Sequence, residues 1–220
     1  AIGLSTNSVS AEDTFNYSGL SWQKDESWGT YNITTLTAYN GAKNLKNALI
    51  HSDNIYFAQS ALKIGSKNME EGLNKLKFND NINFELNLAK SQYSNDGNLE
   101  KETLLADTGY GQGQILVNPI HMASIYSAFY NQGNMIQPYL EFKENTEPTI
   151  LVKNAFTSES AEEIKNDLIQ VVENPEGTAK DMKINGITIA GKTGTAELKS
   201  SKDEKADTIG WFDCFTVNTT

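Results

Sequence analysis

Apolar residues recur at helical spacing in four parts of the chain. The pattern is clearest where Leu45, Ala48 and Leu49 share one face; it stops at a polar break over 51–54 and resumes at Ile55. The predicted helices cover residues 44–64, with a pause at that break, and residues 69–76, 119–130 and 161–172.

Residues at the ends of two of these segments are typical of helix termini. Asn118 can cap the helix that begins at Pro119, since proline is well suited to the first helical position. Gly133 can close the same helix. Ser160 and Glu163 have the spacing of a capping box, which predicts that the last helix begins after Ser160.

Runs rich in β-branched and aromatic residues predict strands. They cover residues 31–37, 184–190 with a continuation to about 197, and 208–217. We expect the last two strands to pair antiparallel through the charged loop at 199–207. The polar, Asn-rich stretch at 78–100 predicts an extended loop, and the glycines within 104–114 predict a turn.

These elements predict an α+β fold, an antiparallel sheet with helices, in a single domain of 220 residues. A helical lobe is expected over roughly 41–175 and a sheet region over roughly 184–220.

Composition narrows the classes of function. The formal net charge of −10 argues against a partner with a phosphate backbone, so no nucleic acid is expected to bind. A single cysteine, Cys214, excludes an internal disulfide, and the two histidines, His51 and His121, lie far apart. We therefore expect no metal site and no cofactor. No apolar run reaches the ~18 residues that a membrane-spanning helix needs.

Residues 191–195 continue a predicted strand, but their side chains are suited to binding a ligand and not to packing in a core. Lys192 supplies a cation, and the hydroxyls of Thr193 and Thr195 can bind a carboxylate. Gly191 and Gly194 have no Cβ, so a ligand can approach the backbone closely. A K-[ST]-G triplet arises by chance in roughly one such chain in five, usually as a surface hairpin. Other motifs must therefore support it.

Ser52-Asp53-Asn54 is the second candidate. About two S-x-N triplets are expected by chance at this composition, and Ser5-Thr6-Asn7 and Ser66-Lys67-Asn68 also match. The Ser52 triplet differs because it lies in a short break between two apolar helical faces. There a hydroxyl and an amide can project into a cleft, although a helix N-cap is the simpler alternative.

Two further segments are candidate motifs beside K-T-G and Ser52-Asp53-Asn54. Gly111-Gln112-Gly113 stands before Asn118-Pro119, and Val171-Val172 precedes Gly177-Thr178-Ala179. In this order the four motifs resemble those of the transpeptidase domain of class B penicillin-binding proteins, with K-T-G as the active-site strand. Within this family, the chain most resembles the low-affinity, methicillin-resistance type. The segments that carry this resemblance are Trp22-Gln23-Lys24-Asp25-Glu26-Ser27-Trp28-Gly29, Ser52-Asp53-Asn54-Ile55, Leu104-Leu105-Ala106-Asp107 and Ala196-Glu197-Leu198.

The resemblance implies an antiparallel sheet with helices of the penicillin-binding and β-lactamase type, and it implies catalytic roles. In this family a serine of an S-x-x-K helix attacks the carbonyl of a D-Ala-D-Ala stem peptide, activated by the neighbouring lysine. Ser52 matches the serine that relays protons, and Asn54 matches the amide that orients the substrate. Lys192 matches the lysine that keeps the site electropositive.

The same resemblance implies substrate-binding roles on the predicted strand. Thr193 and Thr195 would bind the terminal carboxylate, and the backbone N–H of Thr195 would form half of the oxyanion hole. Such a donor typically contributes about 2.7–4 kcal/mol in the transition state. Gly194 would let the substrate lie along the strand edge.

The chain departs from the family at the nucleophile. Its two S-x-x-K strings begin at Ser21 and Ser60 and end at Lys24 and Lys63, and neither has the position or packing expected of the nucleophile helix. We therefore expect a transpeptidase domain incomplete at both ends, without its catalytic serine and lysine, that penicillin does not acylate.

The leading hypothesis is a serine-type D,D-transpeptidase of cell-wall cross-linking. Its partners would be peptidoglycan stem peptides and β-lactams, at the outer face of the cytoplasmic membrane, with anchoring through a segment outside this sequence. A serine β-lactamase or D,D-carboxypeptidase shares some motifs, and a non-catalytic β-lactam sensor or peptidoglycan-binding module is a third alternative. We also expect an unprotected sheet edge that favours dimers.

Overall fold

The computed structural model describes residues 1–141, 144, 147–198 and 207–218. The helices are α1 (Ile2–Ser5), α2 (Leu45–His51), α3 (Asn54–Ile64), α4 (Ser66–Lys75), α5 (Glu102–Gly109), α6 (Pro119–Tyr130) and α7 (Ser158–Glu173), with 3₁₀ turns η1 (Glu26–Trp28) and η2 (Lys180–Met182). The strands are β1 (Ser21–Trp22), β2 (Ile33–Thr34), β3 (Met135–Ile136), β4 (Ile150–Val152), β5 (Ile189–Leu198) and β6 (Asp207–Thr216).

The predicted helix with a pause is confirmed as α2 and α3. Asn44 caps α2 by accepting from the backbone N–H of Asn47. At α6, Asn118 accepts from Ile120 N with Pro119 in the first turn, as predicted. The N–H of Gly133 donates to a carbonyl of the last turn of α6 and closes it. At α6, the predicted capping residues therefore marked both ends of the helix correctly.

The turn predicted over 104–114 is wrong in its first half, because Glu102–Gly109 is the helix α5. Leu105 and Ala106 are buried there. A Cβ on Gly109 would lie 2.5 Å from the carbonyl oxygen of Phe57, so glycine lets α5 pack directly on α3. Close helix packing, not a turn, explains this glycine.

Two predicted boundaries also need correction. The last helix begins at Ser158, because Thr157 accepts from Ser160 N as the N-cap; the capping box at Ser160 and Glu163 is absent. The helix predicted over 69–76 begins three residues earlier, at Ser66. Both starts precede the apolar stripe from which they were predicted.

The strands in the structure differ in length and number from those predicted. The 31–37 strand reduces to β2, and β3 and β4 were not predicted. Ile184 and Ile187 bridge across a tight turn at Gly186 instead of opening β5, which begins at Ile189. An Asn-Gly pair between two isoleucines is itself a hairpin signal, and it outweighed their strand propensity here.

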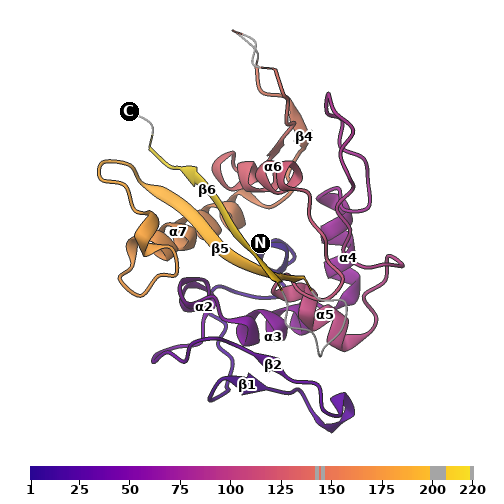
Figure 1. Ribbon diagram of the computed structural model, residues 1–220, viewed down its shortest axis with the longest axis vertical. Coiled ribbons are helices and arrows are strands. Elements are labelled where there is room, and N and C mark those ends of the chain that lie inside the picture. Colours follow the sequence, from indigo (N-terminus) through magenta and orange to yellow (C-terminus); the bar gives the residue numbers. More distant parts are fainter. Residues whose placement is uncertain (142–143, 145–146, 199–206, 219–220) are drawn as a thin grey trace.

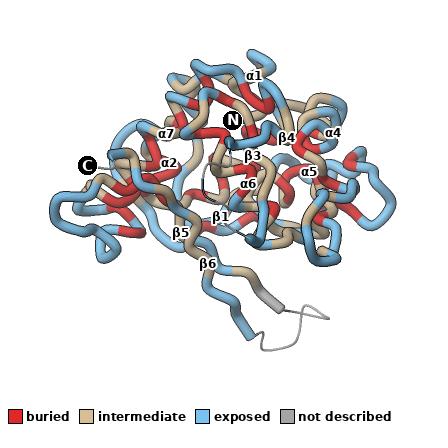
Figure 2. The backbone as a smooth tube through the Cα atoms, turned by 90° about the horizontal axis from the view of Figure 1, so that it is seen from above, coloured by how far each residue is buried: buried red, intermediate tan, exposed pale blue. Residues whose placement is uncertain are grey.

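Strands β5 and β6 form the predicted antiparallel pair, in which Lys192 lies opposite Asp213. Helix α7 packs against β5 and α6 against β6 (Figure 1). Figure 2 shows the far end of this hairpin projecting from the body, with exposed and half-buried residues. The loop predicted over 199–207 lies outside the described residues except for Asp207, which begins β6. The α+β fold class is confirmed.

The core fills the space between the helices and the near end of β5. Ala48 of α2, Val171 of α7 and Ala190 of β5 are fully buried in one cluster. This packing brings the start of β5 against the α2–α3 junction. Within the described part of the chain, no helix combines the length and apolar character that crossing a membrane requires.

Candidate active site

The junction between α2 and α3 presents Ser52. Ser52 ends α2 in the left-handed region, with φ 54° and ψ 55°, which residues other than glycine rarely adopt. Asp53 then caps α3, accepting from Ile55 N at 3.0 Å and Tyr56 N at 3.3 Å. The triplet predicted from sequence thus combines a helix cap with a residue that contacts β5. Asp53 serves the first role and Ser52 the second.

Lys192 of β5 meets Ser52 directly. Its Nζ donates to Ser52 Oγ at 2.7 Å and to the carbonyl oxygen of Thr193 at 2.9 Å. The expected contact between the two motifs, 140 residues apart, is confirmed. Burial lowers the pKa of the Lys192 ammonium to about 8, because desolvation disfavours its charged form. A lysine with this pKa can hold or release a proton near neutral pH.

Asn54 opens α3 beside this contact. Its Nδ2 donates to the carbonyl oxygen of Thr34 in β2 at 2.9 Å. This bond ties the junction to the β1–β2 hairpin and orients the amide. That Asn54 faces the same cleft as Lys192 stays a prediction.

Thr193 connects β5 to the segment after α7. Its Oγ1 donates to Thr178 Oγ1 at 2.9 Å, and Thr178 N donates to Ile50 O of α2 at 3.2 Å. The Gly177-Thr178-Ala179 motif thus links the K-T-G strand to the α2–α3 junction. Sequence reasoning placed this motif correctly in order but did not identify Thr178 as a contact.

The two glycines of β5 differ in how closely a side chain at their position would approach β6. A Cβ on Gly191 would lie 2.9 Å from Cys214 Cβ and 3.0 Å from the Phe212 ring, so packing against β6 requires its absence. A Cβ on Gly194 would lie 3.3 Å from Trp211 Cβ, a tight contact. Gly194 is exposed, as is Thr195.

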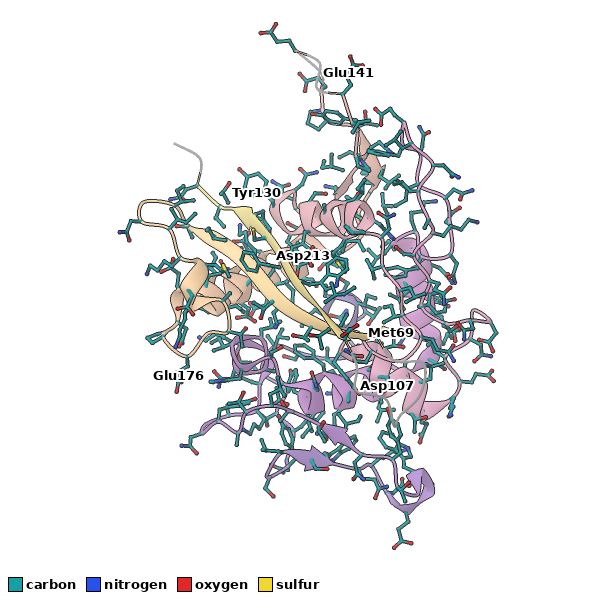
Figure 3. The ribbon with its side chains drawn as sticks, viewed as in Figure 1. Met69, Asp107, Tyr130, Glu141, Glu176 and Asp213 are labelled. Atoms are coloured by element: carbon teal, nitrogen blue, oxygen red, sulfur yellow. The ribbon has the colours of Figure 1, made fainter. Side chains whose placement is uncertain are left out.

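Gln112 also reaches β5, and sequence reasoning missed it as a site residue. Its Nε2 donates to the carbonyl oxygen of Thr195 at 3.2 Å across a solvent-exposed gap. Gly111 and Gly113 flank it with φ near +80°. The backbone N–H of Gln112 donates to the carbonyl oxygen of Asp107 in α5, a residue labelled in Figure 3. The G-Q-G motif was the available signal.

Neither S-x-x-K string forms a comparable serine–lysine pair. Ser21 is exposed on β1, and Lys24 pairs with Glu102. Ser60 Oγ donates to Tyr56 O of its own helix, while Lys63 Nζ lies 2.6 Å from Asp13 Oδ2. In both strings the lysine pairs with a carboxylate instead of with the serine of its own string.

Comparison with known proteins identifies the architecture. Residues 1–218 match the penicillin-binding protein transpeptidase domain. The chain is 43% identical over 213 residues to penicillin-binding protein 3 of Bacillus subtilis, covering 96% of this chain and 32% of that protein. It is 31% identical over 162 residues to a probable peptidoglycan D,D-transpeptidase, PbpC, of Pseudomonas aeruginosa, covering 72% of this chain and 27% of that protein.

Solved structures agree on the fold. The D,D-transpeptidase domain of a peptidoglycan glycosyltransferase from Eggerthella lenta superposes with a TM-score of 0.79 at 24% identity, covering 98% of this chain and 54% of that one. The transpeptidase domain of Burkholderia pseudomallei penicillin-binding protein 3 gives 0.79 at 20% identity, covering 95% and 62%. The chain spans about a third of the length of the curated relatives it matches. This chain therefore belongs to the penicillin-binding protein transpeptidase family.

Proposed function

We propose that this chain carries the proton-relay and substrate-binding part of a serine D,D-transpeptidase site that cross-links peptidoglycan. The observation that carries the proposal is the hydrogen bond from Lys192 Nζ to Ser52 Oγ, made by a buried lysine whose pKa is about 8. A lysine–serine pair of this kind can pass a proton to a leaving amine.

The other proposed roles follow the strand. Asn54 orients the acyl-amide of the substrate, and the hydroxyls of Thr193 and Thr195 bind the terminal carboxylate. The backbone N–H of Thr195 donates to the oxyanion, a contribution of about 2.7–4 kcal/mol. Gly194 leaves room for a peptide along β5. The ligands are stem peptides ending in D-Ala-D-Ala and the β-lactams that resemble them, on the cell-wall side of the cytoplasmic membrane.

The nucleophile of the proposed reaction is neither Ser21 nor Ser60. Lys24 and Lys63 pair with carboxylates, and a protonated lysine cannot accept the proton of a serine hydroxyl. Ser52 serves as the relay instead. A misplaced attacking atom would forfeit much of a proximity advantage that can reach about 7–11 kcal/mol.

Intact-mass measurement after incubation with benzylpenicillin tests this division of roles. The 220-residue chain should keep its mass, whereas the full-length gene product should gain one long-lived penicilloyl adduct. Lys192→Met and Ser52→Ala should slow formation of that adduct. Rapid turnover would indicate a β-lactamase, and a stable adduct without peptide cross-linking would indicate a sensor. An adduct on the short chain that Ser21→Ala or Ser60→Ala abolishes would contradict the exclusion of those serines.

We also propose that the edge of the β5–β6 hairpin pairs with a second copy of the chain. Among the described residues, β5 and β6 form a sheet of only two strands, and an unpaired edge is a template for further pairing. Light scattering at high protein concentration should report a dimer. A monomer under those conditions would contradict this proposal while leaving the enzymatic one intact.

A further inference from the structure

Asp53 is a buried carboxylate whose two oxygens have different partners. The side chain is only 1% exposed. Its Oδ1 accepts the two backbone N–H groups at the start of α3, while its Oδ2 accepts the phenol O–H of Tyr17. Because a buried charge must be hydrogen-bonded, the phenol satisfies the oxygen that the helix cap does not use.

Tyr17 comes from a distant part of the chain that is itself held in place. Lys43 Nζ lies 5.6 Å from the centre of the Tyr17 ring and 3.3 Å from that of Tyr39. The backbone N–H of Phe15 donates to Lys43 O at 3.3 Å. Burial and the Asp53 hydrogen bond both raise the pKa of the Tyr17 phenol, so it stays a donor across the physiological range.

The residue that depends on this anchor is Ser52. Its left-handed backbone is unfavourable for a side-chain-bearing residue and persists only when its surroundings hold it. On one side it ends α2, and on the other it is joined to Asp53. A rotation of Asp53 would therefore move Ser52 Oγ away from the 2.7 Å contact with Lys192.

We propose that Tyr17 is a positioning residue of this site: its phenol holds Asp53, and Asp53 in turn holds Ser52 in hydrogen-bond reach of Lys192. This inference deepens the proposed function and rests on it for its consequences in catalysis. Tyr17 touches neither the reacting atoms nor Lys192, so it acts only through the geometry of the α2–α3 junction.

The chain offers a matched control. Tyr31 also donates its phenol O–H to an aspartate, Asp107 of α5, and it is half-buried like Tyr17. Tyr31→Phe and Tyr17→Phe each remove a phenol O–H that donates to an aspartate, and both keep the aromatic ring. If Tyr17 is merely structural, the two substitutions should have the same consequences at Lys192.

The first experiment uses the 220-residue chain with ¹³C-labelled lysine and follows the titration of Lys192 by NMR. Ser52→Ala, which removes the contact itself, sets the reference change. Tyr17→Phe should shift the Lys192 titration in the same way, and Tyr31→Phe should leave it unchanged. An unchanged titration in Tyr17→Phe, or in Ser52→Ala, would overturn the inference. This test needs no nucleophile and no ligand, so it stands even if the proposed enzymatic function is wrong.

Asp53→Asn provides a second variant, which changes the acceptor side of the same hydrogen bond. Its amide oxygen can still cap α3, and its NH₂ can donate to the Tyr17 oxygen, so a hydrogen bond remains. Lys192 should titrate nearly as in the wild type. Adding Tyr17→Phe to Asp53→Asn should then bring the change seen in Ser52→Ala. A Lys192 titration that is the same in the single variant and in the double variant would contradict a positioning role for Tyr17.

In the full-length gene product, Tyr17→Phe should slow acylation by benzylpenicillin about tenfold to a hundredfold, the usual effect of a small misplacement. The dissociation constant of the preceding non-covalent complex should stay near that of the wild type, because Tyr17 does not touch the ligand. A weakened non-covalent complex with an unchanged acylation step would contradict the inference. A wild-type protein that is never acylated would refute the proposed function and leave the NMR result to decide the positioning role.

Discussion

Ser52 and Gln112 both contact β5, and each lies in a short non-helical segment next to a helix. The two segments are held in place by different interactions. Ser52 comes from the α2–α3 junction, where the buried Asp53 holds the backbone and the contact with Lys192 measures 2.7 Å. Gln112 comes from the loop after α5, where Gly111 and Gly113 shape the backbone and the 3.2 Å contact is exposed to solvent. A buried polar anchor defines the first position, and only backbone conformation defines the second.

This difference indicates which hydrogen bond to β5 has a fixed geometry and which one can be replaced. A hydrogen bond shielded from water is electrostatically stronger than one that water can replace. At the Lys192 end of β5 the geometry is therefore fixed, as the proposed proton relay requires. At the Thr195 end, a ligand of the proposed site would displace the Gln112 side chain at small cost.

The largest expected effect comes from removing the buried anchor. Asp53→Ala deletes the cap of α3 and leaves the Tyr17 phenol without this acceptor, so the free energy of unfolding should fall by about 3 kcal/mol. Asn44→Ala deletes only the cap of α2 and should cost about 1 kcal/mol. Urea denaturation measures both. Equal losses would show that Asp53 is an ordinary helix cap.

The buried lysine should make stability depend on pH. The folded-state pKa of Lys192 is about 8, below the 10.5 of a free lysine, so between these values the unfolded chain binds the extra proton. Stability from this group should therefore rise as the pH goes from 8 to 10.5, by at most about 3 kcal/mol. Lys192→Met should lose that rise. Identical slopes of unfolding free energy against pH in the two proteins would contradict the burial argument.

The loop that carries Gln112 should respond to loss of its glycines. A Cβ on Gly113 would lie 3.0 Å from Asp107 Cβ, whereas one on Gly111 would meet nothing within 4 Å. Both alanine variants bear the cost of a positive φ, about 1 kcal/mol. Gly113→Ala should be about 1 kcal/mol less stable than Gly111→Ala because of crowding. The reverse order in thermal denaturation would mean that the loop is held by other contacts.

The smallest effect should be that of Gln112→Ala. An exposed hydrogen bond adds little net stability, so the free energy of unfolding should change by less than about 0.5 kcal/mol. Ser52→Ala, which removes the shorter contact to Lys192, should cost about 1 kcal/mol. The comparison between the two segments would fail if Gln112→Ala proved as costly as Ser52→Ala.

Local chemistry in the sequence determined much of this molecule. The apolar stripe of α2 and α3 and the cap at Asn118 can be recognised in the sequence because they depend on residues within one or two turns. The pairing of β5 with β6 followed from two β-rich runs. The order of the motifs identified the family, and it also predicted the meeting of Ser52 with Lys192.

Tertiary structure alone decided the features that depend on distant surfaces. From the sequence, Gly109 predicts a turn. In the structure it lies in α5, where the lack of a Cβ allows close packing on the backbone of α3. The hydrogen bond of the Tyr17 phenol to Asp53 and that of Gln112 to the Thr195 carbonyl both join segments far apart in the chain. The pKa of Lys192 belongs to the same class. Desolvation depends on which surfaces exclude water around a charge, and neighbours in sequence do not determine which surfaces meet.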